Sequence, residues 1–185
     1  MSYNQNIASS TKYGSIKVGT GLSVTNGLVS ANGITDANLG YFYSTQTQTN
    51  AASINIVTMN NTGLSQGISL VSNSRLTVTK SSNYNLSIMI QFIKSSSAGG
   101  SAIGYFWLRK NGLDVANSAS NITTNENNGG VVGSWTYALP LVANDYLEMA
   151  WASTQSNATL ISRIAQVGPP IIPQNPSVRM TLLEI

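Results

Sequence analysis

One segment, residues 104–112, constrains the fold more than any other. It reads GYFWLRKNG, an aromatic and aliphatic run that ends at two cations and an Asn-Gly pair. Successive side chains of a β-strand point to opposite faces, so Tyr105 and Trp107 share one face while Phe106 and Leu108 share the other. Both faces are therefore apolar. Such a strand lies between two layers of one domain, or between one layer and a neighbouring subunit.

Apolar residues recur at every second position in much of the chain, which predicts β-strands and no long helix. The alternation is clearest in residues 86–92 and 146–151. Further strands are predicted at residues 41–49, 53–58, 68–71, 75–79, 131–139, 159–164 and 177–183. Short strands separated by Asn, Gly, Ser and Pro clusters indicate an all-β fold, an antiparallel β-sandwich or jelly roll.

Three segments depart from this pattern. Residues 1–38 hold very short apolar alternations around the turn-forming pair Asn26-Gly27. Residues 168–176 hold four of the five prolines, which predicts a stiff extended loop before the last strand. Residues 117–130 are polar and rich in asparagine, which predicts a long exposed loop. We expect an N-terminal attachment segment at residues 1–38 and a jelly-roll domain at residues 39–185.

Composition excludes several classes of function. Charged residues make up 8% of the 185-residue chain, and Ser, Asn and Thr fill about a third of it, so neutral polar groups supply its solubility. The nine cations are scattered and the net charge is +3, so we expect no nucleic-acid partner. The chain has no cysteine, which excludes disulfides and thiolate metal sites. We expect no metal and no cofactor.

The carboxylates offer no catalytic constellation. They are Asp36, Asp114, Glu126, Asp145, Glu148 and Glu184. Without His or Cys, a nucleophile-base triad needs an unusual base. Asp145 and Glu148 are three residues apart on a predicted strand and leave opposite faces, whereas glycoside hydrolysis needs two facing carboxylates. We interpret Asp145 as a turn residue that caps backbone amides, and Glu148 as a salt-bridge partner of Arg109 or Lys110. We expect no catalytic residue and no enzyme.

The N-terminal residues lack the charged start and apolar stretch of a signal peptide. No segment approaches the roughly 18 consecutive apolar residues that span a bilayer. We therefore expect synthesis in the cytoplasm, no membrane insertion, and release only as part of a particle.

Four motifs follow one another in residues 41–185: YNLSIMIQF at 84–92, WLRKNG at 107–112, WTYALPLVANDYLEMAW at 135–151, and PSVRMTLLEI at the end. This order resembles the tumour necrosis factor and complement globular-head superfamily. It is more closely similar to the version in virion structural proteins of tailed bacteriophages, especially those of cyanobacteria. Asn144 stands where the family usually has a turn glycine, and asparagine tolerates the left-handed conformation. Residues 19–27 also resemble a GxGLxVxxNG repeat of trimeric viral fibre shafts.

The resemblance implies a homotrimer of ten-stranded jelly rolls that pack through aromatic faces about a threefold axis. The residues themselves also favour subunit contact, because the run at 104–108 has more apolar surface than one core can bury. We expect the trimer interface to contain Tyr41, Tyr43, Tyr105, Trp107, Tyr146 and Trp151. The alternative is that these side chains fill the interior of a monomeric sandwich. Some relatives hold calcium near the axis, but no calcium-loop spacing occurs here.

The resemblance also implies a phage virion protein, either a trimeric surface projection or a capsid decoration protein. The expected location is the virion, after synthesis in the host cytoplasm, and the expected partners are capsid or tail subunits. Residues 1–38 would attach it, because extended segments bind by adding strands to partner edges. The expected attachment residues are Ile16, Val18, Leu22, Val24 and Leu28. A triple-stranded shaft, an ordinary hairpin and a flexible anchor remain alternative structures for this segment.

The alternative function is a receptor-binding knob of a tail or head fibre, which adheres to host surface glycan or protein. Its candidate host-contact residues are Asn117, Asn121, Asn125, Asn127 and Asn128. Sugars stack on aromatic rings and hydrogen-bond to amides. The loop that carries these residues supplies amides but no ring, which weakens this alternative. A secreted signalling ligand is disfavoured because the chain shows no secretion signal.

Overall fold

The computed structural model describes residues 22–25, 28–31, 37–51, 53–94, 100–125 and 129–185. The chain divides into two units, Met1–Asp36 and Ala37–Ile185. In the first unit, β1 (Leu22–Thr25) and β2 (Leu28–Ala31) form an antiparallel pair. They flank the dipeptide Asn26-Gly27, whose residue types favour a two-residue hairpin connection. The described part of this unit therefore agrees with the hairpin alternative.

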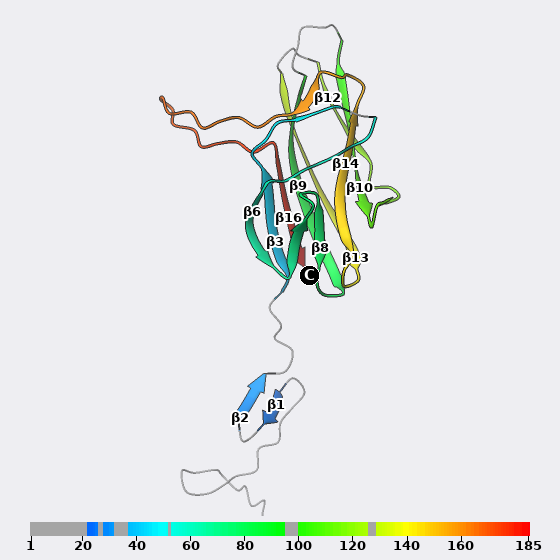
Figure 1. Ribbon diagram of the computed structural model, residues 1–185, viewed down its shortest axis with the longest axis vertical. Helices are drawn as coiled ribbons and strands as arrows, with labels where there is room; N and C mark the ends of the chain where they lie inside the picture. Colours follow the sequence, from blue (N-terminus) through cyan, green and yellow to red (C-terminus); the bar gives the residue numbers. More distant parts are fainter. Residues whose placement is uncertain (1–21, 26–27, 32–36, 52, 95–99, 126–128) are drawn as a thin grey trace, which may run out of the picture. The chain divides into compact units, whose positions relative to one another are not determined.

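The second unit is an antiparallel sandwich of two sheets (Figure 1). The strands of sheet 1 are β3 (Leu39–Ser44), β4 (Gln48–Thr49), β6 (Asn61–Gln66), β9 (Ser82–Lys94), β13 (Gly130–Leu141), β15 (Ala158–Leu160) and β16 (Val178–Glu184). The strands of sheet 2 are β5 (Asn55–Ile56), β7 (Ile68–Val71), β8 (Arg75–Val78), β10 (Ala102–Lys110), β11 (Leu113–Asp114), β12 (Ser120–Thr124) and β14 (Tyr146–Ser153). In this unit, ten of the described strands have four or more residues.

Strands that are distant in sequence lie side by side in both sheets. Sheet 1 runs β4-β15-β9-β16-β3-β6, and β13 also pairs with β9. Sheet 2 runs β11-β10-β14-β8-β7, while β12 pairs with β10 and β5 pairs with β14. The described strand pairs are antiparallel, so the predicted all-β antiparallel sandwich is confirmed.

The core lies between the sheets and is built by the two-residue period of the strands. On β9, Leu86, Ile88, Ile90 and Phe92 are all at most 1% exposed, as their alternation with polar residues predicts. They meet an inward row on sheet 2 that contains Phe106 and Leu108 from β10 together with the apolar residues of β14. The expectation that Phe106 and Leu108 share a buried face is confirmed.

Tight turns join several of these strands where the sequence predicts them. Asn111 and Gly112 both have positive φ, 52° and 80°, and they join β10 to β11 as the Asn-Gly pair predicts. Asn144 also has a positive φ, 73°, in the turn two residues before β14 begins. The expected left-handed conformation at Asn144 is therefore confirmed.

Two strands lie where no strand was predicted, and three predicted strands differ in extent. The strand predicted at 41–49 is divided into β3 and β4, and the one predicted at 53–58 covers only Asn55–Ile56. β12 occupies part of the polar segment 117–130, which was expected to be a loop throughout, and β6 follows the predicted strand at 53–58. Both are largely polar, so neither shows a clear apolar alternation. Polar strands suit these positions because each pairs with only one neighbour in its sheet. β15 ends at Leu160 rather than at residue 164.

Candidate functional site

The six expected interface aromatics do not form one surface. Tyr41 and Tyr43 alternate on β3 with the buried Phe42, so they lie on the outer face of sheet 1. Tyr105 and Trp107 alternate on β10 with the buried Phe106, so they lie on the outer face of sheet 2. Phe42 and Phe106 belong to the same core cluster between the sheets. The two aromatic sets therefore face in opposite directions.

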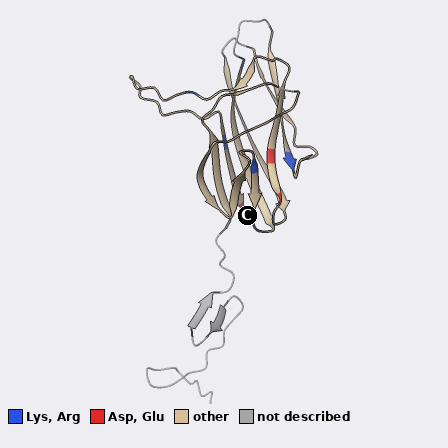
Figure 2. Ribbon diagram, viewed as in Figure 1, with Lys and Arg blue, Asp and Glu red and all other residues tan. Residues whose placement is uncertain are grey.

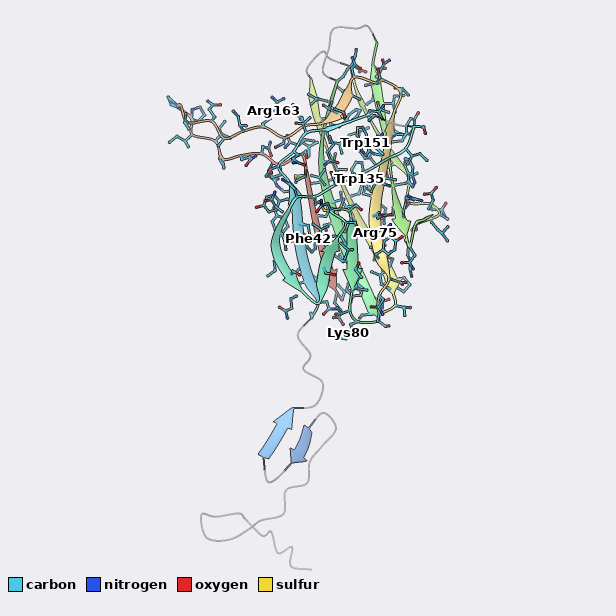
Figure 3. All side chains as sticks on the ribbon, in the orientation of Figure 1. Phe42, Arg75, Lys80, Trp135, Trp151 and Arg163 are labelled. Carbon is cyan, nitrogen blue, oxygen red and sulfur yellow. The ribbon has the colours of Figure 1, made fainter. Side chains whose placement is uncertain are left out.

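The prediction that Trp151 contacts other subunits is wrong. Trp151 is 1% exposed, and its ring stacks on Phe106 at 6.3 Å between centroids and 10° between planes. Phe106 in turn packs on Trp135 at 5.1 Å, and Figure 3 labels Trp135 and Trp151 within the sandwich. Trp151 shares the inward row of β14 with Leu147 and Met149, both at most 1% exposed. The interior alternative therefore holds for this residue.

On sheet 1, exposed apolar side chains gather around the two tyrosines. The Tyr41 and Tyr43 rings stack with their centroids 5.5 Å apart. Met89 on β9, Leu64 on β6 and Val132 on β13 are 37%, 45% and 60% exposed. We call this surface the β3 face; it consists of Tyr41, Tyr43, Leu64, Ser87, Met89, Val132, Ser134, Arg179, Thr181 and Leu183.

Strand register explains how the β3 face is organised. Tyr41 lies opposite Thr181, which lies opposite Ser87, while Arg179 lies between Tyr43 and Met89. Small hydroxyl side chains therefore sit between larger ones, and they leave a shallow hollow of about 200 Å³ beside Tyr41 and Met89. The result is an exposed apolar surface with a recess, which is typical of a surface that contacts another protein.

The β3 face is nearly free of charge. Its one ionic side chain is Arg179, whose guanidinium donates to Met89 Sδ at 3.2 Å and to Asn175 Oδ1 at 3.3 Å. Figure 2 shows how sparse charged residues are on the strands of the described sandwich. Two copies of such a face can meet without burying a carboxylate, and the one cation that each contributes, Arg179, is already held by Met89 and Asn175.

Among the described residues, every Asp and Glu carboxylate has a basic partner. The ion pairs are Arg75–Glu148 at 3.2 Å, Lys80–Glu184 at 2.5 Å, Arg109–Asp114 at 3.1 Å and Lys110–Asp145 at 2.7 Å. The prediction that Glu148 pairs with Arg109 or Lys110 is therefore wrong. Arg109 does lie opposite Glu148 in the sheet, but its guanidinium turns to Asp114 and to the carbonyl of Gly112 on its own hairpin.

Asp145 holds a turn together, and the prediction that it caps a backbone amide is confirmed. Its carboxylate accepts hydrogen bonds from the Val142 amide at 2.8 Å and from Asn111 Nδ2 at 2.7 Å, in addition to the Lys110 ion pair. It lies just before β14, in the turn rather than on the strand. Burial raises the pKa of Asp145, but the bonds from Lys110, Val142 and Asn111 outweigh burial and lower the pKa to about 2.

This lowered pKa predicts a loss of stability in acid. The unfolded carboxyl, with a pKa of 3.8, takes up its proton at a higher pH than the folded one. The stabilisation is therefore complete above the unfolded pKa and is lost as the pH falls towards 2. We expect Asp145→Asn to lower the free energy of unfolding by on the order of 1 kcal/mol near pH 7, after allowance for solvent screening, and by much less near pH 2. Urea unfolding followed by circular dichroism measures both values. Equal losses at the two pH values would contradict this role.

On the outer face of sheet 2, Tyr105 is the most open of the expected aromatics, at 41% exposed. Trp107 donates its Nε1 hydrogen to Asp114 at 2.9 Å. The half-buried ring of Tyr146 lies under the guanidinium of Arg75, 4.6 Å from the ring centroid. Trp107 and Tyr146 therefore have partners within the chain, and Tyr105 is the ring best placed to meet a ligand.

The candidate host-contact residues are spread over several elements. Asn121 is exposed on β12, directly opposite Tyr105 on β10. Asn117 has a positive φ of 61° before that strand, and Asn125 is exposed just after it. Asn127 and Asn128 lie outside the described residues. The sequence suggested that this segment has amides without an aromatic ring, but the pairing of β12 with β10 gives Asn121 an aromatic neighbour.

Of the expected attachment residues, Ile16 and Val18 lie outside the described residues. Leu22 and Val24 belong to β1, opposite Ala31 and Val29, and Leu28 begins β2. Within the described ranges, no three His, Cys, Asp or Glu side chains gather into a metal-binding group. No helix in those ranges is long and apolar enough to cross a membrane.

Sequence reasoning missed most of the β3 face. Met89 carried a readable signal, because it is an apolar residue in the otherwise polar outward row of β9, next to Ser87 and Gln91. Val132 and Leu64 gave none, since their outward direction depends on which strands pair. Arg179 gave none either, because its neighbours come from β3 and β9.

Comparison with known proteins identifies the fold. No protein-family model and no curated protein matches this chain. Among solved structures, it is similar to crystal structures of murine APRIL at pH 8.0 and pH 8.5, with TM-scores of 0.51 and 0.50 and 8% sequence identity. Each match covers 81% of this chain and 100% of the murine chain. The sandwich is therefore a jelly roll of the tumour necrosis factor type.

Proposed function

We propose that this chain is a non-enzymatic structural protein of a tailed-phage virion, a homotrimeric surface projection or capsid decoration protein. The observation that carries the proposal is the β3 face, an exposed and nearly uncharged surface with two stacked tyrosines and a recess. A surface of this kind gains free energy when a partner removes it from water. In the proposed trimer, each subunit supplies such a surface to the assembly.

The virion role is supported by the sequence. The four motifs of residues 41–185 resemble, in their order, those of virion proteins that carry this fold, including the Asn-Gly hairpin, although Asn144 stands in place of the usual glycine before Asp145. A non-enzymatic role is supported by the carboxylates, because each one in the described ranges is engaged in an ion pair within the chain. None of these is left as a free acid or base that faces another across a cleft.

Attachment to the particle would fall to residues 1–38. Most of this segment, Met1–Asp36, is a separate unit in which the described strands form a hairpin. Short strands with unpaired edges can extend a partner's sheet through main-chain hydrogen bonds. The described sandwich has a core cluster of its own.

A second candidate function is a receptor-binding knob that recognises host surface glycan. The observation that favours it is the pairing of exposed Asn121 with Tyr105, which puts an amide beside an open aromatic ring on one face. This surface lies on sheet 2, opposite the β3 face, so it would stay accessible in a trimer that associates through sheet 1.

A truncated chain that starts at Thr35 separates the two candidates. We expect it to remain a folded trimer by sedimentation velocity, and to bind particles that lack the protein at least about tenfold more weakly than the full chain. The control is the full chain on the same particles. Unchanged particle binding would contradict attachment through the N-terminal segment. If the truncated trimer blocked phage adsorption to host cells at saturating concentration, the receptor-binding function would be favoured instead.

A further inference from the structure

Between β15 and β16 the chain leaves the sandwich as a narrow two-stranded projection, residues 161–176 (Figure 1, orange to red). Arg163 and Asn175 exchange two backbone hydrogen bonds, both of 2.9 Å. Further out, Gln166 and Ile172 exchange two more, of 2.8 and 3.1 Å. The two legs are therefore paired along their length and do not form a loose loop.

The projection displays branched aliphatic side chains to solvent. Ile164, Val167 and Ile171 are 87%, 92% and 80% exposed. A single exposed aliphatic residue is ordinary, but three such residues within eight positions on one projecting element form an apolar surface that its own subunit leaves uncovered. Its single charged residue is Arg163, labelled in Figure 3.

The projection is preorganised for contact. Its base is fixed to the body by the Ser162 amide, which donates to Thr47 Oγ1 at 3.1 Å, and within the base Ser162 Oγ donates to the Asn175 carbonyl at 3.2 Å. Four of its residues are prolines, which fix the backbone φ angle. A segment that is ordered before binding loses little conformational freedom when it meets a partner.

The base of the projection is joined to the β3 face. Asn175 Nδ2 donates to Gln91 Oε1 at 3.0 Å, and Asn175 Oδ1 accepts from Arg179, which belongs to that face, at 3.3 Å. The projection also connects β15 and β16, two strands of sheet 1. Polar contacts therefore tie the base of the projection to the edge of the β3 face, while the projection itself extends away from the sandwich (Figure 1).

We propose that the projection packs on the β3 face of a second copy of this chain. The proposal rests on the self-association proposed above and specifies which two surfaces of neighbouring copies meet. The two surfaces match in chemistry, since one is aliphatic and the other is apolar and recessed, and neither carries a carboxylate. A leg of seven or eight residues reaches roughly 20 Å, about the width of the four or five strands that carry the face. Each copy then offers a projection to the next copy and receives one, and this head-to-tail contact closes in a ring.

The triple variant Ile164→Ser, Val167→Ser, Ile171→Ser tests whether the aliphatic side chains of the projection stabilise the trimer. We expect at least a tenfold rise in the trimer dissociation constant by sedimentation equilibrium, with an unchanged circular dichroism spectrum. The matched control is Leu113→Ser, because Leu113 is 75% exposed on β11 of the opposite sheet. Its dissociation constant should equal that of the wild type.

Cross-linking tests the geometry independently, and it is clean because the chain has no cysteine. Val167→Cys and Met89→Cys chains are refolded together with a short bismaleimide. We expect cross-linked dimers that contain one chain of each kind, and none when Leu113→Cys replaces Met89→Cys. Suppose that the wild type is a trimer, that the cross-link does not form and that the triple variant is not weakened. This result overturns the projection contact and leaves the proposed self-association standing. A monomeric wild type overturns the proposed self-association itself.

Discussion

Replacing Trp151 with alanine is expected to lower the free energy of unfolding by about 3–5 kcal/mol, the range for large aromatic truncations in cores. Trp151 is 1% exposed and stacks on Phe106, and that ring also contacts Trp135 and Phe92. The variant loses the buried ring and leaves a cavity at the centre of this aromatic cluster. Neighbours on both sheets have to move to fill it, so only part of the loss is recovered.

The matched control is Trp107→Ala, which removes the same side chain from the outer face of β10. We expect a loss of about 1 kcal/mol there, mainly from the hydrogen bond to Asp114 and partial burial. Urea unfolding by circular dichroism, at one fixed protein concentration, measures both variants. If the Trp151→Ala chain kept its stability but dissociated, the result would contradict a core position for Trp151 and would support its role as a subunit contact.

The second large effect is expected from Tyr41→Asp, which should raise the trimer dissociation constant by at least about 100-fold. Tyr41 lines the recess of the β3 face, and a carboxylate there would be buried in the proposed interface, where the one cation of the recess, Arg179, already donates to Met89 and Asn175. An equilibrium shift of this size corresponds to about 2.7 kcal/mol. The subunit itself should still fold, because Tyr41 lies outside the core.

Thr123→Asp is the control for this variant, since Thr123 is exposed on β12 of sheet 2. It introduces the same charge into a strand of the opposite face and should leave the dissociation constant within twofold of the wild type. Sedimentation equilibrium gives both constants, and circular dichroism verifies that the two chains are folded. If both variants weakened the trimer equally, net charge rather than the β3 face would govern association.

The parts of the fold that follow local rules were predictable from the sequence. The alternation of residues 86–92 predicted the inward row of β9, because the period of a strand fixes which side chains share a face. Asn144 and the Asn111-Gly112 pair predicted left-handed turns, because few other residues tolerate positive φ. The prolines of residues 168–176 predicted an extended segment before the last strand.

The parts that depend on distant pairing were not predictable. Glu148 meets Arg75 because β8 lies beside β14 in sheet 2, and no local pattern announces that neighbour. Trp151 has the alternation of a core residue, but the same alternation suits an interface. β12 was missed because Ser120–Thr124 is largely polar, and its partner β10 comes from the run at 104–108 that is apolar on both faces. Its pairing nevertheless supplies the aromatic neighbour that the asparagine-rich segment lacked.

The scarcity of charge on the β3 face and on the projection has a consequence for how the proposed assembly responds to salt. Salt weakens contacts between ions by screening them, but it leaves the burial of apolar side chains intact, and some salts strengthen that burial. In the proposed assembly, subunits held together by tyrosine, methionine, valine and isoleucine would therefore keep their contacts in dilute fresh water and in brine alike.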